Sequence, residues 1–291
     1  MTRGSMNVST FSIVARDPRS GELGVAVASK FFAVGAVVPW VAADIGAVAV
    51  QSFVNGRFGK QALDLLRQER SAQDCLDHLI GTDAEPDGRQ LGIVDAHGQA
   101  AAFTGPSSLP WAGHRTGDGY AAQGNYLVGP ETVDAMATVF EANPQMDLPG
   151  RLLRALKAGQ EAGGDKRGRQ GAALVVHRTD GGYGGSDVVV DLRVDDDAEP
   201  VAELERLLAS QHLYFDHSDP TERLVIEGAI EAELRRALIR LGQLSADATG
   251  ADFLAALRTV SLITNLDERV HIDRREIDPP ALAYLAALVK L

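Results

Sequence analysis

Cysteine is almost absent from this chain of 291 residues, and long hydrophobic runs are absent altogether. The single cysteine, Cys75, excludes an intramolecular disulfide framework and a zinc site built from several cysteines. A helix that crosses a bilayer needs about 18 consecutive apolar residues. The longest stretch of low charge, residues 31–50, is interrupted by glycine, proline and Asp44. We therefore expect no transmembrane segment and no membrane as a partner.

Basic residues are also scarce, with 28 lysines and arginines against 40 aspartates and glutamates and a net charge of -12. Proteins that bind nucleic acid through its phosphates carry a basic surface. Nucleic acid is therefore not expected as a partner. Residues 1–10 contain one arginine and no apolar core, which is unlike a secretory signal. The expected compartment is the cytoplasm.

Motifs for metals and cofactors are missing as well. The seven histidines show no metal-ligand spacing, and the closest pair at a helix end, His212 and His217, fits surface or capping roles. The sequence has no Walker loop, no serine elbow and no dinucleotide fingerprint after a strand. Cys75 lies in a predicted helix, where a small buried hydrophobe is expected rather than a nucleophile. We therefore expect neither a cofactor nor a metal.

What the chain does contain is regular hydrophobic patterning, with 45% hydrophobic and 23% charged residues. Residues 10–16 alternate small polar with apolar side chains, and residues 22–29 return with the same period after a turn, which predicts a β-hairpin. The same reasoning predicts, in order, a strand at 46–51, helices at 61–68 and 71–80, a hairpin at 90–104, a strand at 119–123, helices at 131–141 and 148–161, and a strand pair at 172–178 and 186–194.

The order of these elements favours the α+β class. Hairpins dominate, which indicates antiparallel sheets, and the strict strand–helix alternation of doubly wound folds is missing. Helices that arrive in pairs would cover the outer faces of two stacked sheets. The sequence therefore predicts a four-layer αββα sandwich.

The pattern becomes helical after about residue 200. A helix is predicted at 201–215, followed by helices at 219–241, 251–261 and 279–288. We expect a first domain at 1–217, with an extension at 1–9 and a connecting helix at 201–217, and a small all-α domain at 218–291.

A threonine, Thr10, stands at the head of the first predicted strand. A threonine hydroxyl is a weak nucleophile and needs an adjacent base. The residue's own α-amine, with a pKa of about 8, can serve as that base when the threonine is the first residue of the chain. The alternative is that Thr10 is simply a β-branched strand residue.

Six blocks of sequence occur together here: residues 9–18, 21–31, 34–39, 89–92, 121–125 and 164–168. In this combination the chain resembles domain-of-unknown-function family 1028, which is placed among the N-terminal-nucleophile (Ntn) hydrolase-like αββα folds. The resemblance covers about residues 10–215. Through residues 231–242, the tail at 218–291 resembles the domain described as peptidoglycan-binding that is often appended to this family.

The resemblance implies an amide hydrolase in which Thr10 attacks a carbonyl and its freed amine acts as the base. Asn125, on a glycine-flanked turn, is the candidate donor to the oxyanion; the alternative is a turn residue that accepts the left-handed conformation. Lys30 would hold the amine neutral or bind a substrate carboxylate, unless it is a surface lysine.

Four further residues are candidates for substrate binding. Asp165 and Arg167 would form an ion pair that orders the pocket, the alternative being a solvated loop. Gln51 and Asn55 complete the candidate set.

The chain departs from the family pattern at its beginning. In typical members the threonine directly follows the initiator methionine, whereas nine residues precede Thr10 here. Processing at the Ser9–Thr10 bond, autocatalytic or by another protease, is therefore required for the expected mechanism.

Two functions follow as expectations. The first is an Ntn amidohydrolase that cleaves a small amide or peptide-like bond, with Thr10 as nucleophile. The second is a non-catalytic protein on the same scaffold that binds peptidoglycan or another ligand, and peptidoglycan fragments are expected partners in either case. The apolar segment 31–34 faces either a second copy of the chain, giving a homo-oligomer, or the core.

Overall fold

The computed structural model describes residues 7–108, 111–216 and 218–288. By its internal contacts the chain divides into two compact units, Met1–Leu208 and Ala209–Leu291. The division falls within helix α5 (Pro200–Phe215), upstream of the boundary expected after residue 217. Each unit has its own hydrophobic core and is described by itself.

Two antiparallel sheets form the centre of the first unit. In the first sheet the strand order is β1 (Asn7–Val8), β5 (Gly46–Phe53), β6 (Arg89–Asp95) and β7 (Ala100–Thr104), and β4 (Pro39–Ala42) also pairs with β5. In the second sheet the order is β11 (Val188–Val194), β10 (Gly171–His177), β3 (Leu23–Ser29), β2 (Phe11–Arg16), β9 (Tyr120–Gly124) and β8 (Gly113–Gly117).

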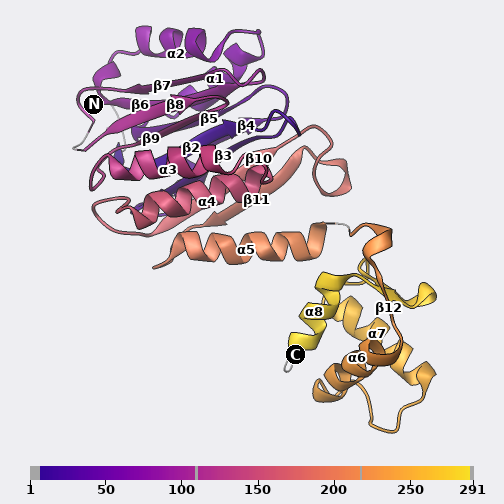
Figure 1. Ribbon diagram of the computed structural model, residues 1–291. Coiled ribbons are helices and arrows are strands. Elements are labelled where there is room, and N and C mark those ends of the chain that lie inside the picture. Colours follow the sequence, from indigo (N-terminus) through magenta and orange to yellow (C-terminus); the bar gives the residue numbers. More distant parts are fainter. Residues whose placement is uncertain (1–6, 109–110, 217, 289–291) are drawn as a thin grey trace. The chain divides into compact units, whose positions relative to one another are not determined.

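A pair of helices packs on the outer face of each sheet (Figure 1). Helices α1 (Phe58–Leu66) and α2 (Ala72–Gly81) share a core with β5 and β6. Helices α3 (Glu131–Ala142) and α4 (Leu148–Glu161) share another with β2, β3 and β10, to which Val201, Leu204 and Leu208 of α5 also contribute. A third core lies between the two sheets.

The alternation of side chains along a strand explains how β5 contributes to two hydrophobic cores. In β5, Val48 and Val50 point outward to the helices, whereas Ala47 and Ala49 point inward to the other sheet. Side chains of a strand alternate between its two faces, so a continuous apolar run is buried on both sides. Gln51, the next inward position, places a polar side chain between the sheets.

Most elements predicted from the sequence are present. The hairpins at 10–29 and 90–104 form as β2–β3 and β6–β7, and the four helices between residues 58 and 161 lie where the periodicity placed them. Ser71 caps α2 by accepting a hydrogen bond from the N–H of Asp74, as its sequence position indicated. Strands β1, β4 and β8 were not predicted, because they are short or, in β8, largely polar.

The second unit corrects the prediction of a small all-α domain. It contains α6 (Gly228–Arg240), α7 (Gly250–Ile263) and α8 (Pro279–Ala287), together with a sheet of β12 (Leu224–Val225), β14 (Glu276–Ile277) and β13 (Val270–His271). The expected helix at 219–241 was wrong in its first part, where a 3-10 turn and β12 precede α6. Strands of two residues are too short to show a two-residue period.

Across the described ranges, none of the helices is long and apolar enough to cross a membrane. Phe31 packs against the core between the sheets, while Phe32 is 61% exposed. The apolar segment 31–34 thus divides between the core and the surface.

Candidate functional site

Thr10 lies where the chain passes from one sheet to the other. Before it, Val8 pairs with Ser52 in the first sheet, and after it, Phe11 pairs with Ala28 in the second. Thr10 is fully buried, and its Oγ1 has no hydrogen-bond partner among the residues that the structure describes. Buried hydroxyls are normally paired, so an unpaired one is a candidate for a chemical role.

Backbone and side-chain donors hold Thr10 in place. Its carbonyl oxygen accepts a hydrogen bond from the backbone N–H of Asn125 at 2.9 Å and another from Gln51 Nε2 at 3.3 Å. Gln51 and Asn125, both predicted from the sequence, therefore meet at the candidate nucleophile although they come from different sheets.

Gln90 connects these two residues. Its Oε1 accepts from Gln51 Nε2 at 2.8 Å and from Asn125 Nδ2 at 2.9 Å, and its own Nε2 donates to Thr104 Oγ1 and to the Gly124 carbonyl. Gln90, which stands near the start of its strand, was not among the residues predicted from the sequence. Its fully buried position opposite Gln51 in the β5–β6 ladder is visible only once the register is known.

A second group of hydrogen bonds lies on the other side of Gln51. Ser12 Oγ donates to Gln51 Oε1 at 2.7 Å and accepts from Gln123 Nε2 at 2.7 Å. Gly92 of β6 makes room for Gln123, since a Cβ at this glycine would lie 2.1 Å from Gln123 Oε1. Ser12 and Gln123 were also missed, because the two-residue period of a strand does not show whether its polar face meets water or another sheet.

Asp165 and Arg167 are brought to the peptide that precedes Thr10. The carbonyl oxygen of Ser9 accepts hydrogen bonds from Ser29 Oγ at 2.5 Å and from Arg167 Nη2 at 2.8 Å. Asp165 orients the guanidinium, because its Oδ1 accepts from Arg167 Nε at 3.0 Å and its Oδ2 from Nη2 at 2.6 Å. The Asp165 side chain is wholly buried, so this is an ordered ion pair.

The side chains of Lys30 and Asn55 make their contacts elsewhere. Lys30 Nζ is exposed and donates to the Arg169 carbonyl at 3.2 Å, while the Lys30 backbone N–H donates to Asp165 Oδ2. Asn55 Oδ1 accepts from the N–H of Arg57 just before α1. The hydrogen bonds of the described residues therefore link Lys30 to the Thr10 region only through its backbone.

A small cavity lies beside the strand that follows Thr10. Its volume is about 40 Å³, and Phe11, Ser29 and Asp165 are among the residues that line it. Within the described part of the chain, histidine, cysteine and acidic residues form no group of three that would hold a metal. Burial raises the pKa of the Cys75 thiol to about 11, which opposes a nucleophilic role.

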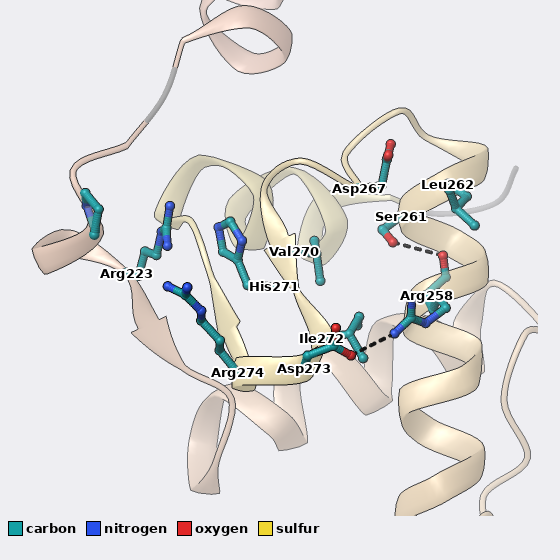
Figure 2. A pocket seen from close by; sticks show the side chains of 11 residues that line it. Arg223, Arg258, Ser261, Leu262, Asp267, Val270, His271, Ile272, Asp273 and Arg274 are labelled. Carbon is teal, nitrogen blue, oxygen red and sulfur yellow. Dashed lines mark hydrogen bonds and ion pairs between the residues drawn. The ribbon is translucent and has the colours of Figure 1, made fainter.

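The second unit has a larger cavity, of about 680 Å³. In Figure 2 the side chains of Arg223, His271 and Arg274 lie on one side of it, and the ion pair between Arg258 and Asp273 lies on the other. Arg223 Nε is buried and lies 3.5 Å from Asp278 Oδ1, without a hydrogen bond within the described residues. The lining is thus rich in guanidinium groups.

Comparison with known proteins places the first unit in a family. The family of unknown function DUF1028 matches residues 10–204. The chain belongs to this family. No curated protein matches. A solved protein of Silicibacter pomeroyi, described as a DUF1028 protein, is 32% identical, with a TM-score of 0.64 over 70% of this chain and 89% of that chain.

A second solved structure is more distant. The ancestral β-subunit, Anbu, of Yersinia bercovieri is 12% identical, with a TM-score of 0.33 over 69% of this chain and 94% of that chain. At this level of similarity it carries no argument about function. The match of the DUF1028 family begins at Thr10.

Proposed function

We propose that this DUF1028 protein is an Ntn-type amidohydrolase that cleaves a small amide or peptide-like bond once its chain begins at Thr10. The supporting observation is the Oγ1 of Thr10, fully buried and unpaired within the described structure, at the head of a central strand. The order of layers (helix pair, sheet, sheet, helix pair) agrees with the αββα sandwich of the Ntn class.

The proposed reaction uses Thr10 alone as nucleophile and base. The α-amine takes the hydroxyl proton as Oγ1 attacks the amide carbon, and the resulting tetrahedral oxyanion collapses to an ester on Oγ1. The leaving amine departs with that proton. A water molecule then hydrolyses the ester, releasing the acid and restoring the hydroxyl.

The amine must first be released by hydrolysis of the Ser9–Thr10 peptide bond. This step consumes one water molecule and leaves a carboxylate on Ser9 and a free amine on Thr10. Either the chain itself or another protease performs it. Before cleavage, the nitrogen of Thr10 is an amide and has no basic lone pair.

The other candidate residues take supporting roles in this proposal. Asn125 and Gln51 fix the Thr10 carbonyl, and Asn125 keeps one Nδ2 hydrogen beyond the one it gives to Gln90 for an oxyanion. Asp165 orients Arg167 for substrate binding. Lys30 and Asn55 remain proposed site residues, without side-chain contacts that support the roles.

The test compares three chains that all begin at position 10: the wild type, Thr10→Ser and Thr10→Ala. Each is incubated with a panel of acyl amides, and products and acyl-enzyme are measured by mass spectrometry. We expect hydrolysis and an acylated residue 10 in the wild type and the serine variant only. Equal hydrolysis by Thr10→Ala would overturn the assignment of the nucleophile.

Ligand binding by the second unit is a further candidate function, favoured by the guanidinium-rich cavity in Figure 2. The proposed ligand is a peptidoglycan fragment, whose carboxylates would pair with Arg223 and Arg274. With the cytoplasm as the proposed compartment, the protein would meet fragments or precursors of the wall. The test is retention of the full chain on insoluble peptidoglycan, compared with Arg223→Ala/Arg274→Ala. No retention of the wild-type chain, or equal retention of both, would overturn this candidate.

A further inference from the structure

Residues 7–9 form an extended segment that enters the first sheet directly before Thr10. Asn7 pairs with Phe53 and Val8 with Ser52, antiparallel to the end of β5. Val8 and Ser9 are buried, with exposed fractions of 0% and 1%. The segment thus fills a site rather than lying on the surface.

The carbonyl at the end of this segment meets donors suited to an amide that is being cleaved. Ser29 Oγ and Arg167 Nη2 both donate to the Ser9 carbonyl oxygen, the atom that becomes negatively charged when a nucleophile attacks this peptide. Preorganised donors at such an oxygen stabilise the tetrahedral state, and a charged donor does so most strongly. Asp165 holds the guanidinium ready before any charge develops.

The end of β5 is shaped for an extended partner. Ser52 adopts a φ of +66°, which is uncommon for a residue other than glycine, at the point where Val8 pairs with it. Without residues 7–9, the backbone groups of β5 that pair with them would be left unsatisfied at a sheet edge. An open edge of this kind accepts an added peptide strand.

We infer that residues 7–9 occupy the acyl side of the substrate site, and that the substrate is an amide whose acyl part is an extended peptide. Its backbone pairs with β5 at Ser52 and Phe53, and its scissile carbonyl binds Ser29 and Arg167. Because Val8 and Ser9 are buried, we expect the substrate to carry a small residue at the scissile bond and an apolar residue before it. This inference rests on the proposed function for its chemistry.

Residues 7–9 and a peptide bound in this way exclude each other. The Ser9 carbonyl already accepts from Ser29 Oγ and Arg167 Nη2, and Asn7 and Val8 already pair with β5. A peptide can therefore bind only after residues 7–9 have left.

The experiment measures peptide binding without turnover. The ligand is acetyl-Asn-Val-Ser with a free carboxylate, titrated by calorimetry into a chain that begins at position 10 and carries Thr10→Ala. The family match starts at this residue, and circular dichroism verifies that the trimmed chain is folded. The intact chain and the peptide acetyl-Asn-Asp-Ser are the controls.

We expect the trimmed chain to bind the Val peptide, the intact chain not to bind it, and the Asp peptide to bind at least about tenfold more weakly. Arg167→Met in the trimmed chain removes a charge-assisted hydrogen bond and should weaken binding by about tenfold or more. A further experiment uses the whole chain with Val8→Asp. The charge should displace residues 7–9 from the apolar site, so this variant should bind the peptide.

Failure of binding by the folded trimmed chain, or equal affinity of trimmed and intact chains, would overturn the inference. Binding and hydrolysis results together distinguish the inference about the substrate site from the proposed function. Hydrolysis of small amides without peptide binding leaves the proposed function and overturns the inference. Peptide binding, combined with no hydrolysis by the trimmed chain that keeps Thr10, supports the site and overturns the hydrolase.

Discussion

Gln51 Nε2 donates to Gln90 Oε1 at 2.8 Å, and this bond between adjacent strands fixes the orientation of both amides. Because Gln90 Oε1 also accepts from Asn125, its Nε2 must point away, toward Thr104 and Gly124. The pair therefore joins the first sheet to the residues that hold Thr10. Removing one member of such a buried network leaves the polar atoms bonded to it without partners, which is costly.

Thr10→Val should separate stability from activity. Valine has nearly the same shape and removes a buried hydroxyl that lacks a partner within the described residues, so the free energy of unfolding should rise by about 1 kcal/mol. In the chain that begins at position 10, hydrolysis should be lost. Chemical denaturation and an amide assay check the two effects, and a marked loss of stability would show that Oγ1 has a partner after all.

Gln90→Leu should destabilise the first unit by about 3 kcal/mol. The substitution leaves Gln51 Nε2 and Asn125 Nδ2 buried without their acceptor, and each such donor costs about 1–3 kcal/mol. Denaturant unfolding measures the change. Gln68→Leu, at an exposed glutamine after α1, is the matched control and should change stability little; similar losses in both variants would contradict the role of Gln90.

Gly92→Ala should disturb the contact between the sheets. The added Cβ would lie 2.1 Å from Gln123 Oε1, so Gln123 must move and its bond to Ser12 must weaken. We expect a loss of about 1–3 kcal/mol in thermal or denaturant unfolding. Gly81→Ala, where a Cβ meets nothing within 4 Å, should be neutral or slightly stabilising.

Cys75 should be unreactive in the folded protein at pH 8. Burial raises the pKa of its thiol from an ordinary value of 9.0 to about 11, so the thiolate is scarce and shielded. Ellman's reagent should label it only after denaturant is added. Fast labelling of the native chain would contradict the burial of α2.

The same shift predicts a stability change in alkali. Between pH 9 and 11 the unfolded chain releases the thiol proton while the folded chain keeps it, so rising pH favours unfolding. The wild type should therefore lose stability in this range relative to Cys75→Ala. Denaturant midpoints of both chains at several pH values provide the comparison.

Local patterns in the sequence were enough to predict most of the first unit. Strand β5 shows its apolar run directly, and α2 shows both its apolar spacing and its Ser71 cap. The second unit was harder, because strands such as β12 are two residues long and Pro220 begins a 3-10 turn rather than a helix.

The candidate site likewise contains residues that the sequence could indicate and residues that it could not. Thr10 could be selected from the sequence because it stands at the head of a predicted strand, and Gln51 and Asn125 were selected through the family resemblance. Gln90 and Ser29 could not be selected. Their roles depend on which strands lie side by side and on which face each side chain points to.

The sequence by itself determined the helices and most of the strands of the first unit, since the two-residue and 3.6-residue periods are local properties of the chain. Tertiary structure alone decided that Arg167 reaches the Ser9 carbonyl across 158 residues of sequence, and that Gln90 joins Gln51 to Asn125. Hydrogen bonds between distant segments depend on sheet register and layer packing, which no local pattern encodes.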